Sequence, residues 1–141
     1  MKLQDIPVSL QPIDNDDAQS TLTPALLTEI ADHLEALQAR GATGLIDLRG
    51  LPMTASDRSA LIDVLGLGEV TIQVDALGRS EARETGYAGV WWVEHRSPDG
   101  MTVAEHIEIA PIPQIAPAHP EDIRSALTRL RARSEPGGAV Q

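Results

Sequence analysis

A run of two-residue alternation in the middle of the chain constrains the fold most strongly. Residues 70–76 alternate between apolar and polar side chains, which is typical of a strand with one buried face. Turn signals follow at Gly78, at residues 86–89 and at the Ser-Pro-Asp-Gly sequence 97–100, where proline and glycine suit the backbone angles of tight turns. Because short turns join antiparallel neighbours, the sequence predicts a meander of four strands, at residues 70–76, 80–85, 90–96 and 101–109.

Helical spacing of apolar residues precedes this run. A first helix is predicted from Thr23, a suitable N-cap that is followed by Pro24, to the stop signal at Gly41. Its apolar stripe consists of Leu26, Leu27, Ile30, Leu34 and Leu37. The stripe predicts a helix that packs one side on a core and leaves the other in solvent.

Two further helices and one short strand complete the expected elements. Residues 44–48 are largely apolar and indicate a buried strand. A second, shorter helix follows it, capped by Thr54 or Ser56, with an apolar stripe of Leu61, Ile62 and Leu65. A last helix is predicted over residues 120–133, and its stripe of Ile123, Leu127 and Leu130 is expected to dock on the rest of the domain.

This order predicts the fold class. We expect an α+β fold with a mainly antiparallel sheet, a four-strand meander plus an earlier short strand, and two to three helices packed on one face. The domain is expected over residues 21–133, after an irregular lead-in at residues 1–20 and before a flexible tail at residues 134–141. Within the lead-in, the alternation of Ile6, Val8 and Leu10 allows a short edge strand.

Charge and composition exclude several classes of function. Twenty-one acidic residues against eleven basic ones give a net charge of −10, which disfavours nucleic-acid backbones and anionic membranes as partners. The chain has no cysteine, so a thiol nucleophile, a disulfide framework and thiolate-bound zinc or iron–sulfur clusters are excluded. No cofactor is predicted. No secretory signal or apolar run long enough to span a bilayer is found, so we expect a cytoplasmic protein.

The predicted hairpin at residues 90–109 carries most of the distinctive side chains. If residues 97–100 form a four-residue loop, Arg96 pairs with Met101 and Trp91 lies opposite His106 on one face of the sheet. A slip of one residue would exchange the two faces, so this register is a hypothesis.

The adjacent Trp91 and Trp92 point to opposite sides of their strand in either register. All three aromatic residues of the chain lie at positions 87–92, so these tryptophans dominate its aromatic surface. Two interpretations stay open. Both can be packing elements, one in the core and one under a loop, or one can be an exposed anchor for a partner.

Titratable side chains on the return strand invite a metal interpretation. His106 and Glu108 share a strand face, and His95 joins them in the register above. Their spacing matches no metal signature, and cross-strand ion pairs explain the same residues, so no metal ligand is predicted. Neither a phosphate-binding loop nor a nucleophile elbow is present. We therefore predict no catalytic residue and no enzyme.

Several segments, in their order and spacing, resemble the C-terminal conserved region of the HupH/HyaF hydrogenase expression proteins. The resemblance is carried by residues 83–91 (Arg-Glu-Thr-Gly-Tyr-Ala-Gly-Val-Trp) and 104–109 (Ala-Glu-His-Ile-Glu-Ile). It is also carried by residues 46–52 (Ile-Asp-Leu-Arg-Gly-Leu-Pro), by Asp57-Arg58 and by residues 67–70 (Leu-Gly-Glu-Val). It covers residues 24 to 115.

The resemblance implies a cytoplasmic accessory protein in the maturation of an uptake nickel–iron hydrogenase. It implies chaperone-like binding of a hydrogenase subunit precursor, together with other maturation proteins, rather than catalysis. By resemblance alone, the candidate partner-binding residues are Arg49, Glu84, Tyr87, Trp91, Glu105 and His106. For Arg49 and Glu105, the alternative interpretation is a buried ion pair that fixes the sheet.

Two alternatives come from different classes of protein. One is a small metal-handling protein that uses His95, His106 and nearby carboxylates. The other is a homodimeric structural module, in which a second copy of the chain buries the spare tryptophan.

Overall fold

Helices and strands follow one another in the order that the hydrophobic pattern predicts. The computed structural model describes residues 21–136, so the edge strand predicted at Ile6, Val8 and Leu10 lies outside the described residues. The elements are α2 (Leu22–Arg40), β1 (Gly44–Asp47), α3 (Ala55–Leu65), β2 (Thr71–Ala76), β3 (Gly78–Glu84), β4 (Val90–Arg96), β5 (Thr102–Ile109) and α4 (Pro120–Ser134).

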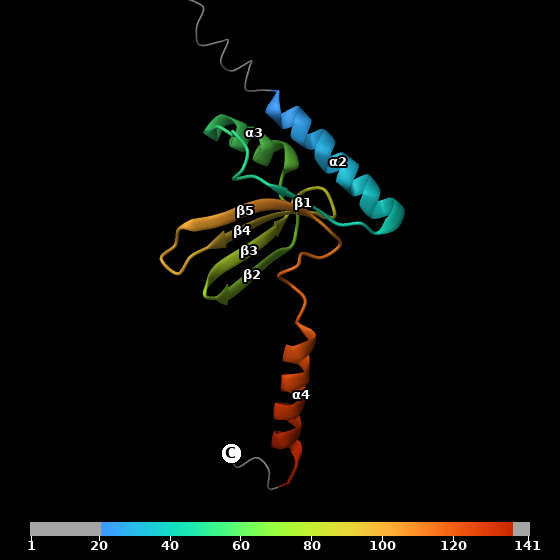
Figure 1. Ribbon diagram of the computed structural model, residues 1–141, viewed down its shortest axis with the longest axis vertical. Coiled ribbons are helices and arrows are strands. Elements are labelled where there is room, and N and C mark those ends of the chain that lie inside the picture. Colours follow the sequence, from blue (N-terminus) through green and yellow to red (C-terminus); the bar gives the residue numbers. More distant parts are fainter. Residues whose placement is uncertain (1–20, 137–141) are drawn as a thin grey trace, which may run out of the picture.

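The strands form one antiparallel sheet. Their order is β1-β5-β4-β3-β2, so β2 to β5 make the predicted meander and β1 adds to its far edge beside β5. Helices α2 and α3 cover one face of the sheet, and α4 projects from the other side (Figure 1). The α+β prediction is confirmed, with two helices on one face.

Local signals account for the ends of the two covering helices. Helix α2 begins at Leu22, so Thr23 lies in its first turn and the prediction of Thr23 as N-cap is wrong. Pro24 permits this, because backbone N–H groups in the first turn have no intrahelical acceptor. Gly41 ends the helix as predicted, in a left-handed conformation with φ of 72°. For α3, Thr54 rather than Ser56 is the N-cap, and it forms a capping box with Asp57.

The main core lies between these helices and the sheet. Its buried members are Leu26 and Ile30 of α2, Leu61 and Leu65 of α3, and Ile46, Leu48, Val90, Trp92, Ile107 and Ile109 of the strands and their ends. Burial of these side chains holds the helical layer to the sheet, at about 25 cal/mol per Å² of apolar surface removed from water. Among the described residues, no helix is both long and apolar enough to cross a membrane.

The β4–β5 hairpin corrects the predicted register. Trp91 pairs with Glu108 instead of His106, a shift of two residues. One residue comes from the loop, which has three residues because Ser97 pairs with Met101 and Gly100 takes a positive φ. The other comes from Val103, an extra residue in β5 that faces no partner in β4. A shift of two preserves the faces, so the predicted sides hold for β4 and for residues 104–109. Thr102 lies before the bulge, is shifted by one residue and lies on the side of Glu94 instead of that of His95.

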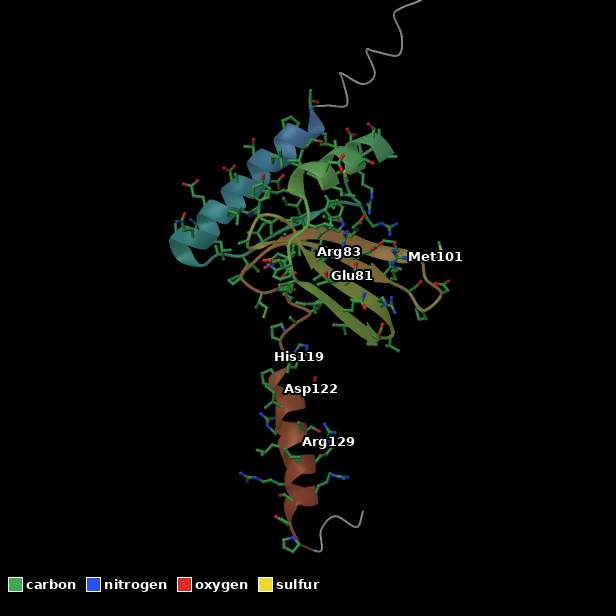
Figure 2. The ribbon with its side chains drawn as sticks, turned by 180° about the vertical axis from the view of Figure 1, so that it is seen from behind. Glu81, Arg83, Met101, His119, Asp122 and Arg129 are labelled. Carbon is green, nitrogen blue, oxygen red and sulfur yellow. The ribbon has the colours of Figure 1, made fainter. Side chains whose placement is uncertain are left out.

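Helix α4 forms where predicted but does not dock. None of its residues is buried, so the prediction that its stripe packs on the domain is wrong for the single chain. After β5 the chain crosses the face opposite α2 and α3, and α4 therefore begins on the far side of the sheet from the helical layer. In Figure 2, His119, Asp122 and Arg129 mark this segment as it leads away from the sheet.

Candidate functional site

The two tryptophans are buried on opposite faces of the sheet. Trp92 packs in the main core under α2 and α3 and is 4% exposed. Trp91 is 5% exposed and packs with Ala82, Val93 and Ile115, and its indole Nε1 donates to the carbonyl of Ala110 at 3.0 Å. The interpretation of both as packing elements is confirmed. The interpretation of one as an exposed anchor is wrong, because the segment after β5 covers Trp91 within the same chain.

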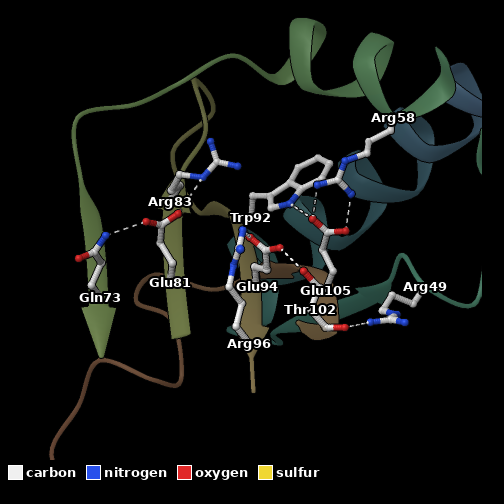
Figure 3. Close-up of polar contacts among 10 residues, drawn as sticks. All are labelled: Arg49, Arg58, Gln73, Glu81, Arg83, Trp92, Glu94, Arg96, Thr102 and Glu105. Carbon is white, nitrogen blue, oxygen red and sulfur yellow. Dashed lines mark hydrogen bonds and ion pairs between the residues drawn. The ribbon is translucent and has the colours of Figure 1, made fainter. Parts of the chain in front are cut away.

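On the helical face, an ion pair links α3 to the sheet (Figure 3). Arg58 donates through both terminal nitrogens to the two carboxylate oxygens of Glu105, with 2.6 Å between Nη2 and Oε2. Trp92 Nε1 donates to the same Oε2 at 2.8 Å, and the Arg58 guanidinium lies 5.4 Å from the Trp92 ring centroid. Three elements, α3, β4 and β5, are thereby tied together at one carboxylate.

These contacts set the ionisation of the pair. Burial disfavours the charged carboxylate of Glu105, but hydrogen bonds from Arg58 and Trp92 outweigh it and hold the pKa of Glu105 below its usual value. The hydrogen bond to Glu105 raises the pKa of Arg58. Both groups are therefore charged at neutral pH. The positive charge of Arg58 compensates the buried negative charge of Glu105.

Arg49 is not the partner of Glu105. Its guanidinium donates to the backbone carbonyl of Thr102, and its backbone N–H donates to Asp47 Oδ1 at 3.0 Å. The predicted alternative of an Arg49–Glu105 ion pair is therefore wrong. Helix α3 places Arg58 at both oxygens of this carboxylate instead. Arg49 instead fastens the loop after β1 to the start of β5.

A row of carboxylates crosses the same face beyond the helices (Figure 3). Glu94 of β4 pairs in register with Glu81 of β3 on one side and with Glu105 of β5 on the other. Like charges in this arrangement repel, and the row is balanced by arginines, with Arg83 3.4 Å from Glu81 and Arg96 3.2 Å from Glu94. These pairs are part of the sheet's own charge balance.

On the opposite face, three histidines approach a cavity of about 620 Å³. His95 and His106 line it together with Glu108 and His119, which confirms that the first three share a face. The rings of His95 and His106 are 5.7 Å apart, and His106 Nε2 is 3.8 Å from Glu108 Oε1. Burial lowers the pKa of His106, with His95 adding to the effect and Glu108 opposing it. In the described part of the chain, no three His, Asp or Glu residues are arranged to hold a metal ion.

A different set of contacts positions Tyr87. The turn between β3 and β4 is clamped to the end of α3, because the N–H of Gly86 donates to the carbonyl of Leu65 and that of Gly68 to the carbonyl of Glu84, both at 2.8 Å. A Cβ at Gly68 would lie 2.5 Å from the Thr85 carbonyl oxygen, so the close approach requires glycine. Two of the segments that carry the family resemblance, 67–70 and 83–91, therefore meet in space.

This clamp completes an apolar groove between α2 and α3. The groove has a volume of about 190 Å³ and is lined by Leu27, Ile30, Ala31 and Leu34 of α2, Val64 and Leu65 of α3, and Tyr87. Tyr87 is 52% exposed, and Val64 and Leu67 beside it are exposed as well. An apolar surface that stays open beside a fully formed core is a candidate binding surface.

The six predicted site residues do not form one site. Glu84 and Tyr87 lie at the turn beside the groove, Arg49 and Glu105 are held in contacts near α3 and β5, and Trp91 and His106 lie on the opposite face. Sequence reasoning missed Val64 as a groove residue. Its signal was an apolar side chain outside the predicted stripe of the second helix.

The described chain is thus an α+β domain with one antiparallel sheet, two helices on one of its faces and an apolar groove between those helices. The model of the family described as HupH hydrogenase expression protein, C-terminal conserved region, matches residues 21–136, and the chain belongs to this family.

Individual relatives carry matching names. The solved structure of the hydrogenase expression protein HupH from Thiobacillus denitrificans has a TM-score of 0.74 and 38% identity, over 79% of this chain and 92% of that chain. The hydrogenase expression/formation protein HoxQ of Cupriavidus necator is 31% identical over 107 residues, and HupH of Rhodobacter capsulatus is 32% identical over 108. The matches cover 76% and 77% of this chain, and the chain spans only 38% and 39% of those relatives.

Proposed function

We propose that the chain is an accessory module for the maturation of a nickel–iron hydrogenase and that it binds a precursor of a hydrogenase subunit in the groove between α2 and α3. The relatives named as hydrogenase expression or formation proteins support the maturation role. The observation that carries the binding role is the open apolar groove, with Tyr87 at its edge on a turn that is hydrogen-bonded to the end of α3.

The chemistry of the groove favours an apolar segment of the partner. Groove recognition of this kind uses side chains at helical spacing as anchors, and the groove offers aliphatic side chains and one aromatic ring. A partly folded precursor exposes such segments before its own core is complete. The net charge of −10 further favours basic residues around that segment.

The predicted site residues take different roles in this proposal. Tyr87 contacts the precursor. Glu84 positions that turn, because its backbone carbonyl and carboxylate accept from Gly68 and Glu69. Glu105 positions α3 through Arg58. Arg49, Trp91 and His106 lie outside the groove.

The test is capture of an identified subunit from hydrogenase-producing cells. The tagged chain and its variants Val64→Asp and Tyr87→Ala are purified, and hydrogenase subunits are quantified by mass spectrometry. We expect the native chain to retain a subunit precursor and Val64→Asp to lose at least tenfold, because a carboxylate in the groove must be desolvated. Leu77→Asp is the matched control, since Leu77 lies exposed in the β2–β3 turn.

Two outcomes contradict the proposal. One is that no hydrogenase subunit accompanies the native chain. The other is that Val64→Asp and Leu77→Asp retain the subunit equally well, with both variants shown to be folded by circular dichroism.

A further inference from the structure

Within residues 21–136, helix α4 is an amphipathic helix of which no residue is buried. Ile123, Leu127 and Leu130 follow i, i+4, i+7 spacing and form one apolar stripe, and Leu127 at its centre is 50% exposed. An isolated helix of 15 residues is marginal in water, and most helices gain stability by packing such a stripe on another surface.

The same chain carries a surface that fits this stripe, but α4 cannot reach it. The groove lies between α2 and α3, whereas α4 begins beyond the opposite face of the sheet (Figure 1). The connection is anchored there, because the N–H of Gln114 donates to Glu108 Oε2 at 2.9 Å and Ile115 packs in the Trp91 cluster. A groove in a second copy has no such restriction.

Charge favours the same pairing. Helix α4 carries four arginines and two acidic residues, a net charge of +2 in a chain of −10, so the remainder of the chain carries −12. Helix α2 carries three carboxylates, Glu29, Asp32 and Glu35, against one arginine. Glu35 lies one turn from the groove residue Ala31 and therefore beside the groove. A basic amphipathic helix thus matches an apolar groove with an acidic helix at its side.

We propose that two copies of the chain associate by placing α4 of each copy in the groove between α2 and α3 of the other. The helical layer and α4 lie at opposite ends of the long axis of the molecule (Figure 1). A two-fold axis perpendicular to that long axis brings both α4–groove contacts together at once, so the assembly closes at two copies. This goes beyond the proposed function, because it gives the groove a second occupant, which a hydrogenase subunit displaces when it binds.

The experiment measures the mass of the purified full chain by light scattering over a wide concentration range. The native chain and the control Leu77→Asp are expected to form dimers. Leu127→Asp, which damages the helix stripe, and Val64→Asp, which damages the groove, are each expected to weaken dimerisation at least tenfold. Leu127 is exposed in the single chain, so Leu127→Asp leaves the core of the domain intact.

A mixture of the two variants separates this arrangement from others. Val64→Asp retains an intact α4 and Leu127→Asp retains an intact groove, so the mixture is expected to form heterodimers through one of the two contacts. Pairing of α4 with α4 predicts that Val64→Asp dimerises like the native chain and that mixing adds nothing. Either that result or a native chain that is monomeric at all concentrations overturns the inference.

The dimer and the proposed function can be contradicted independently of each other. A native chain that stays monomeric yet captures a hydrogenase subunit contradicts only the dimer. A native chain that dimerises through the groove, together with a Leu127→Asp variant whose free groove captures no subunit, contradicts only the proposed function.

Discussion

The two faces of the sheet bury neighbouring tryptophans equally well by different means. Trp92 lies under two amphipathic helices, and Glu105 and Arg58 join its indole to α3. Trp91 lies under an irregular segment in which Ile115 makes the apolar contact and the Ala110 carbonyl accepts the indole N–H. The two tryptophans are therefore equally buried but not equally well held in place. A helix makes contacts along its whole length, whereas a short irregular segment does not.

This difference assigns the faces different tasks. The helical face contains the main core and, at its open side, the groove in which we place a partner. The opposite face contains the histidine cavity and the start of the segment that leads to α4. The predictions below test whether this division holds, beginning with the largest expected effect.

Replacing each tryptophan with alanine compares the two faces directly. We expect Trp92→Ala to lower the free energy of unfolding by about 4–5 kcal/mol and Trp91→Ala by about 3 kcal/mol, measured by urea denaturation. The irregular segment over Trp91 can collapse into the vacated space more easily than two packed helices can. Equal losses, or a larger loss for Trp91→Ala, would contradict the unequal support of the two faces.

The ion pair on the helical face is expected to give the next effect. Arg58→Met leaves the Glu105 carboxylate, whose side chain is 7% exposed, without its charged partner, and we expect a loss of about 2 kcal/mol. Arg83→Met is the matched control. Its partner Glu81 is 28% exposed, so we expect a loss below about 1 kcal/mol. Similar losses in the two variants would show that the Arg58–Glu105 pair has no special role in holding α3.

The faces should also differ in their response to acid. The lowered pKa of His106 means that, below pH 6.5, the unfolded chain binds a proton before the folded chain does, so stability falls as pH falls. The lowered pKa of Glu105 acts in the same direction only below pH 4.5. His106→Gln should therefore flatten the decline of urea midpoints between pH 6.5 and 5 and leave the decline at lower pH. An unchanged decline between pH 6.5 and 5 would remove His106 as its cause.

Tyr87→Ala should change stability least. The side chain is half-exposed and outside both apolar clusters, so we expect a loss of about 0.5 kcal/mol or less in urea denaturation. Its capture of a hydrogenase subunit should nevertheless fall several-fold. A variant that loses stability and binding together would show that Tyr87 acts through the fold.

The sequence predicted the fold well because its signals are local. Two-residue alternation and glycine turns specify the meander, and the stop at Gly41 and the cap at Thr54 specify helix ends. Beyond the bulge at Val103 the predicted faces of β4 and β5 held although the pairs did not, because a shorter loop and the bulge add up to an even shift. Thr102, before the bulge, changed face. Neither the three-residue loop nor the bulge has a sequence signal strong enough to predict it.

The site was predicted less well because its members meet only in three dimensions. Glu105 pairs with Arg58 instead of Arg49, because α3 places Arg58 beside the carboxylate. No spacing in the sequence indicates this placement of α3. The groove depends on contact between the end of α3 and the β3–β4 turn, through Gly68 and Gly86. Helix α4 shows the opposite case, since its stripe was read correctly and its position was not.

Photo-crosslinking from Tyr87 tests the central claim most directly. A photo-reactive aromatic amino acid is placed at position 87 and, in a second sample, at the exposed turn position of Leu77, in cells that produce hydrogenase. We predict that position 87 forms a crosslink to a hydrogenase subunit precursor, identified by mass spectrometry, and that position 77 does not. A crosslink to that subunit from position 77 and none from position 87 would contradict the groove as the binding surface.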